Sequence, residues 1–115
     1  MPIHLPAVNA ESILEAGAKH MRDRAATYDA PTGERSMDKT VTMFNALTGH
    51  GLTETEGWHF MQILKMVRAS QGDYRADNFE DGAAYAALAG ESAAREASIA
   101  HAPVRGRFEL QETAS

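Results

Sequence analysis

The strongest pattern of apolar positions in the chain lies between Thr53 and Gln71. At the turn of about 100° per residue of an α-helix, its large side chains cover one broad face and both flanks of that face. The face is formed by Phe60, Ile63, Leu64 and Val67, and the flanks by Trp58, Met61 and Met66. Only His59, Gln62 and Ala69 are left to meet water. A helix that is apolar this far round is typical of the centre of a bundle.

The ends of this helix are marked by residues that stabilise helix termini. Thr53 and Glu56 have the spacing of a capping box, in which each side chain accepts a hydrogen bond from the other residue's backbone amide. Glu54 and Glu56 also place negative charge at the positive end of the helix dipole. Gly72 suits the left-handed conformation that terminates many helices. The sequence therefore predicts a helix over residues 54–71.

Three further segments carry apolar residues at helical spacing. They predict helices over residues 10–26, 37–48 and 78–97. Their expected N-terminal caps are Asn9, Ser36 and Asp77, the last in a second capping box with Glu80. Apart from a weak candidate in the C-terminal tail, no segment has the alternation of a strand. We therefore expect an all-α, four-helix, bundle-like single domain over residues 10–97, with an extended N-terminal segment (1–9) and a tail (98–115).

Composition limits the functional classes. The chain has 115 residues, 43% of them hydrophobic and 23% charged, which is typical of one soluble domain. Its net charge of −5 argues against nonspecific nucleic-acid binding, although a small local anion site is compatible with it. There is no cysteine, and the five histidines have no zinc-site spacing. No apolar run is long enough to span a membrane, so we expect no membrane association and a cytoplasmic location.

Four short motifs stand out along the chain. They are Tyr28-x-x-Pro31, Glu34-Arg35-Ser36-Met37, Lys65-x-x-Arg68 and Asp81-x-x-x-Tyr85. Together they resemble a family of small proteins encoded by tailed phages and prophages, over roughly residues 10–95. The resemblance implies a phage or prophage accessory protein in the host-cell cytoplasm, and it names no chemistry.

A weaker resemblance is to the MazG-like enzymes, the all-α nucleoside triphosphate pyrophosphohydrolases. Those enzymes hold Mg²⁺ with Glu-x-x-Glu on one helix and Glu-x-x-Asp on a later one. Here the corresponding helices offer Glu54 and Glu56, two apart, and Asp77 and Asp81, four apart. This departure counts against metal-dependent hydrolysis. Mg²⁺ is expected only under that alternative, and otherwise we expect no cofactor.

Polar side chains are expected to converge between the third and fourth helices. Lys65 and Arg68 lie three apart, hence on one side of their helix, beside its apolar face. Asp81 and Tyr85 share an inward-facing stripe of the last helix, and a buried carboxylate there requires a cation or several hydrogen-bond donors. Helices joined by a short loop are usually antiparallel neighbours, so Asp81 should lie within reach of Lys65 or Arg68. Asp81 is about one turn into the last helix and should face the final turns of the preceding helix, which include Arg68. The alternatives are a structural ion pair, an anion pocket, or two solvated cations.

The loop and helix start near Ser36 could extend this cluster. Free backbone amides at a helix N-terminus bind anions, and Arg35 stands beside them. The alternative is a plain cap with Glu34 and Arg35 solvated. Tyr28 packs its ring or contributes to the same site. These four residues, with Lys65, Arg68, Asp81 and Tyr85, are the candidate ligand-binding set.

Three functions remain open at this point. The first is a non-enzymatic accessory protein that binds a host or phage protein, or sequesters a small anionic ligand such as a nucleotide. The second is a MazG-like enzyme, and the third is a purely structural oligomer. Because three partner helices of modest hydrophobicity leave part of the 54–71 helix uncovered, we also expect at least a dimer.

Overall fold

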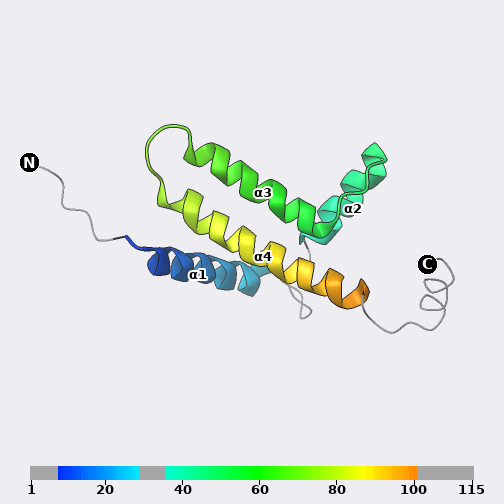
Figure 1. Ribbon diagram of the computed structural model, residues 1–115, viewed down its shortest axis with the longest axis horizontal. Helices are drawn as coiled ribbons and strands as arrows, with labels where there is room; N and C mark the ends of the chain where they lie inside the picture. Colours follow the sequence, from blue (N-terminus) through cyan, green and yellow to red (C-terminus); the bar gives the residue numbers. More distant parts are fainter. Residues whose placement is uncertain (1–7, 29–35, 101–115) are drawn as a thin grey trace, which may run out of the picture.

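The structure, a computed structural model, describes residues 8–28 and 36–100. These residues form four α-helices, α1 (Ala10–Tyr28), α2 (Ser36–Thr48), α3 (Glu54–Ala69) and α4 (Ala76–Ala100) (Figure 1). No strand occurs in the described residues. The expected all-α, bundle-like single domain is confirmed. Most of the predicted N-terminal segment, and the tail from residue 101 with its weak strand candidate, lie outside the described residues.

Two of the predicted helix starts carry the expected caps. The Asn9 Oδ1 accepts from the Ser12 backbone amide at 2.8 Å, and the Asn9 amide donates to the Ser12 hydroxyl at 3.2 Å. At the start of α3, the Thr53 hydroxyl accepts from the Glu56 amide at 3.1 Å, and the Thr53 amide donates to Glu56 Oε1 at 2.9 Å. Gly72, just beyond α3, has the expected positive φ of 72°. Local sequence therefore sets these ends.

The second predicted capping box is wrong. Helix α4 begins at Ala76, so Asp77 lies inside its first turn, and Glu80 bonds to His20 of α1. The Glu80 carboxylate is bound by His20 of another helix, and residues close to Glu80 in the sequence do not reveal such a partner. Helix α4 also continues to Ala100, so the first residues of the predicted tail are helical.

Helices α3 and α4 together form the centre of the arrangement. Helices α3 and α4 lie side by side as an antiparallel pair, and α1 packs on another side of α4 (Figure 1). Helix α2 packs against α3 near the α3 N-terminus. Helix α3 is therefore central as expected, but it shares this place with α4, because each of the two packs on two other helices. Because α4 is rich in alanine, two neighbours can approach its backbone closely.

The side of α3 that faces inward also differs from the expectation. Trp58 and Lys65 are buried, and Gln62 is half-buried. Of the predicted apolar face, Leu64 is half-buried, while Phe60 is 68% and Ile63 55% exposed. The inward side carries polar groups whose partners stand on α4, and these partners determine which side of α3 is covered.

The core is a small cluster at the α3–α4 contact. The Trp58 and Tyr85 rings stack with centroids 5.8 Å apart and an interplanar angle of 23°, and Ala89 is buried beside them. The half-buried side chains that pack against this cluster are Met37, Met61 and Leu88. Aromatic stacking of this kind adds about 0.5–1.5 kcal/mol to the area buried.

Helix α1 makes its closest approach to α4 at Gly17. A Cβ at this position would lie 2.8 Å from the Glu80 carbonyl oxygen and 3.5 Å from the Ala84 nitrogen. Both atoms belong to the backbone, which cannot rotate away as a side chain can. A Cβ at Gly57 of α3 would instead meet side chains of α2, namely those of Met37 and the buried Val41, which can shift more than backbone atoms. Glycine is therefore required more strictly at Gly17.

Replacing Gly17 by alanine should destabilise the domain. The added methyl group has to displace α1 from the Glu80 carbonyl, so the free energy of unfolding in a urea titration should fall by about 1–3 kcal/mol. Gly90→Ala is the matched control, because a Cβ there meets nothing within 4 Å. That control should be neutral or stabilising by up to about 1 kcal/mol. Equal effects of the two changes would contradict the close approach.

Candidate functional site

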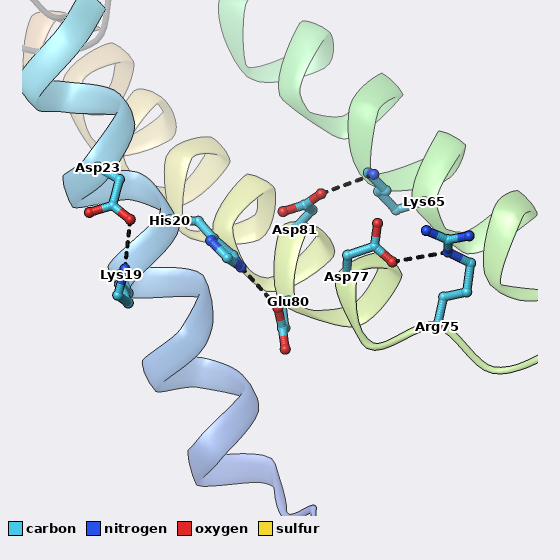
Figure 2. A network of polar contacts seen from close by, with 8 residues as sticks. All are labelled: Lys19, His20, Asp23, Lys65, Arg75, Asp77, Glu80 and Asp81. Carbon is cyan, nitrogen blue, oxygen red and sulfur yellow. Dashed lines mark hydrogen bonds and ion pairs between the residues drawn. The ribbon is translucent and has the colours of Figure 1, made fainter.

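An ion pair joins the last turns of α3 to the first turns of α4. Lys65 Nζ lies 3.0 Å from Asp81 Oδ2 (Figure 2). The short connection over residues 70–75 makes the two helices antiparallel neighbours, so a residue about one turn into α4 faces one about one turn before the end of α3. The prediction that Asp81 lies within salt-bridge reach of Lys65 or Arg68 is confirmed, with Lys65 as the partner.

The two charges of this pair differ in their access to water. The Lys65 side chain is 11% exposed and the Asp81 side chain 24%. A buried ammonium without an anion is strongly disfavoured, whereas a carboxylate with some access to water keeps part of its hydration. Asp81 therefore balances the charge of Lys65, and the pair carries no net charge toward a ligand.

Two of the other predicted residues on α3 and α4 have separate roles. Arg68 is exposed, and no side chain in the described residues forms an ion pair with it. Three residues turn a helix by about 300°, so Arg68 lies about 60° away from Lys65 around α3 and does not join the pair. Tyr85 is buried against Trp58, and together with Asp81 it borders a small hollow next to α1.

The remaining candidates belong to the segment between α1 and α2. Glu34, Arg35 and the side chain of Tyr28 lie outside the described residues. Ser36 is the first residue of α2 and is exposed. An anion site at this helix start, close to Asp81, stays a prediction.

A contact that the sequence did not indicate links α1 to α4. His20 Nε2 lies 2.9 Å from Glu80 Oε1 (Figure 2), with side chains 43% and 22% exposed. The sequence instead predicts a capping role for Glu80. The sequence feature that indicates this contact is Gly17, because a glycine lets two helices approach closely. His20 lies three positions after Gly17 on the same face of α1, so it contacts the same neighbouring helix.

The other end of the α3–α4 pair holds a second polar group that sequence reasoning missed. Arg95 Nη2 donates to Glu54 Oε2 at 2.8 Å, and the Trp58 ring nitrogen donates to the same oxygen at 3.4 Å. The hydroxyls of Thr55 and the fully buried Ser92 are 2.8 Å apart. Glu54 therefore holds two helices together, in addition to its place at the helix dipole.

Two exposed ion pairs complete the polar contacts of Figure 2. Lys19 Nζ lies 2.8 Å from Asp23 Oδ2, and Arg75 Nε lies 3.5 Å from Asp77 Oδ1. The hydrogen bond from Lys19, and then its charge, lower the pKa of the Asp23 carboxyl. The small stabilisation by this pair is therefore lost as the pH falls through that lowered pKa.

No cluster of metal ligands lies in the described part of the chain. Over residues 8–28 and 36–100, no three His, Asp or Glu side chains gather so that they could hold a metal ion. Of the acidic residues that the MazG-like alternative would use, Glu54 and Asp81 are bound to Arg95 and Lys65, respectively.

Within the described residues, no helix has the length and apolarity needed to cross a membrane.

The fold and its contacts define a small helical domain in which α3 is held to α4 by polar pairs at both ends. Residues 12–93 match the model of DUF6378, a domain of unknown function, and the chain belongs to this family. The match takes in α2 and α3 completely and most of α1 and α4. No curated protein and no solved structure matches the chain.

Removing Asp81 should destabilise the protein more than removing Lys65. Asp81→Ala leaves a buried ammonium without an anion, which should cost about 2–4 kcal/mol, somewhat less than for a fully buried pair. Lys65→Met keeps most of the packed stem and leaves a carboxylate that reaches water, so about 1 kcal/mol or less is expected. Urea unfolding of both variants measures the difference.

Asp77→Ala is the control for this comparison, because Asp77 is on the same helix with a half-exposed side chain. It should change the free energy of unfolding by less than about 0.5 kcal/mol. Similar losses for Asp81→Ala and Asp77→Ala would show that the Lys65 pair does not matter for stability.

Proposed function

We propose that this chain is a non-catalytic accessory protein, of the kind encoded by tailed phages, that acts by binding and works as a homodimer. The motifs that resemble the phage family support the first part. The observation that carries the second part is an uncovered apolar stripe on α3, formed by Phe60, Ile63, Met66 and Val67 (the α3 stripe). Their exposed fractions are 68%, 55%, 63% and 46%.

The size of the α3 stripe suits a second copy of the same chain. At these exposed fractions, large apolar side chains show on the order of 100 Å² each, and the stripe therefore about 400 Å². A standard interface buries about 800 Å² on each partner, of which slightly more than half is apolar. The stripe supplies that apolar part, and its polar surroundings supply the rim. A symmetric dimer places the same stripe on both sides of the interface.

Sequestration of an anion at the Lys65 cluster has less support. Lys65 is neutralised by Asp81 at 3.0 Å, and Arg68 stands apart from that pair. A phosphate or carboxylate would have to compete with Asp81 for the same ammonium. The MazG-like alternative also has no observation in its favour among the described residues, because its acidic positions form no cluster there.

Light scattering at tens of micromolar protein should give the mass of a dimer. Ile63→Glu places a charge in the middle of the α3 stripe and should weaken dimerisation at least about 100-fold, because a desolvated unpaired charge costs several kcal/mol. Its helix content by circular dichroism should not change, since Ile63 is exposed in the single chain.

Leu14→Glu on α1 is the matched control, at 62% exposure outside the stripe. This variant should remain a dimer. A monomeric wild-type protein would overturn the homodimer, and the stripe would then be left for a host or phage protein. Equal loss of dimer in both variants would also overturn it, because the effect would then come from added charge alone.

A further inference from the structure

A cleft lies between the C-terminal turns of α3 and the N-terminal turns of α4. Its cavity volume is about 240 Å³. The apolar part of its wall includes Met66, Phe79 and Ala83, and the polar part is Gln62, Lys65 and Asn78. Of the candidate residues derived from the sequence, only Lys65 lines this cleft. Of the α3 stripe, only Met66 borders the cleft, so the cleft and the proposed dimer interface are largely separate surfaces.

Asn78 is the most deeply buried polar residue on the cleft wall. It is only 7% exposed, yet no described residue bonds to its side-chain carboxamide. No fully buried side-chain nitrogen or oxygen in the described residues lacks a partner. The carboxamide of Asn78 therefore keeps some access to solvent, and Asn78 is one of the residues that line this cleft. A largely buried polar group of this kind requires a hydrogen-bond partner.

Gln62 and Lys65 add to the polar wall. Gln62 is half-buried, and its carboxamide also has no partner among the described side chains and backbone groups. Lys65 has three N–H donors, and its ion pair with Asp81 leaves donors to spare. Two residues with carboxamides, each offering a donor and an acceptor, therefore line the cleft together with Lys65, whose charge is already balanced by Asp81.

This combination favours an uncharged ligand. An anion would gain little from a neutralised ammonium, and a cation would find no free carboxylate on the cleft wall. A carboxamide pairs best with a group that offers one donor and one acceptor side by side, which is what an amide offers. The Phe79 ring is 44% exposed and is held by stacking on Tyr74 at 5.7 Å, so it presents a supported flat surface.

The volume limits the size of the ligand. Sites for drug-sized molecules measure about 300–1,000 Å³, so a cavity of 240 Å³ suits a smaller ligand, and a molecule with one ring fits within it. We propose that the cleft between α3 and α4 binds an uncharged planar ring bearing an amide group. The Asn78 and Gln62 carboxamides bond to that amide, and the ring lies against Phe79. The amide is either part of the ring, as in uracil, or attached to it, as in nicotinamide.

Titration of the full chain with nicotinamide and with uracil, followed by protein NMR shifts, tests this proposal. At least one of the two should bind with a Kd of about 1 mM, as expected for so few atoms. Nicotinate has the same ring with a carboxylate in place of the amide, and it should bind at least about tenfold more weakly. Tighter binding of uracil assigns a ring amide, and tighter binding of nicotinamide an attached one.

Two variants separate recognition from folding. Asn78→Leu keeps the bulk and removes the unpaired amide, so its unfolding midpoint should not fall, while affinity drops at least about tenfold. Phe79→Ala should also weaken binding. Phe44→Ala is its control, because Phe44 is 40% exposed on α2, stacks on His50 at 5.9 Å and lies outside the cleft.

Three results would overturn the proposal. The first is that neither amide binds at about 10 mM. The second is that nicotinamide binds but nicotinate binds with the same affinity. The third is that the Asn78→Leu variant binds with unchanged affinity. The Ile63→Glu variant should bind the amide as the wild type does, since Ile63 does not line the cleft. Failure of the homodimer and failure of the cleft are therefore distinguishable.

Discussion

The charge of Lys65 is the constraint on which the arrangement of this protein depends. A buried ammonium is tolerated only beside an anion, and Asp81 of α4 is the anion within reach. Once this pair forms, the side of α3 that faces α4 is decided. Glu54 and Arg95 impose the same orientation at the opposite end of the two helices. Polar matching, more than the area of apolar surface, thus determines what α3 buries.

The surface features of the protein follow from this orientation. With Lys65 turned inward, Phe60, Ile63 and Val67 are turned outward and form most of the α3 stripe. The same orientation brings Gln62 opposite Asn78 of α4, where they line a cleft with polar groups left unpaired. The apolar and polar binding surfaces that we propose therefore share one structural cause.

Local signals in the sequence were sufficient for the helices and for one long-range pair. Asn9, Thr53 and Gly72 set helix ends through neighbours a few residues away, and Asp81 had few possible cations once α3 and α4 were known to be adjacent. The inward face of α3 was not predictable in this way, because periodicity identifies the most apolar side but not its partner. The role of Glu80 was not predictable for the same reason, because its partner, His20, is sixty positions away in the sequence.

The attachment of α2 has a consequence for the dynamics of the fold. Among the described helices α2 packs on α3, Val41 is its one buried residue, and the segment after it is held by two Asn45 hydrogen bonds to Leu52, each 2.9 Å long. The Trp58–Tyr85 stack lies between α3 and α4. Opening of α2 therefore removes Met37 and Val41 from their contacts with α3, while the Trp58–Tyr85 stack itself is formed by α3 and α4 alone. The domain has a separable outer unit, whose amide hydrogens exchange with solvent by local opening while α3 and α4 stay folded.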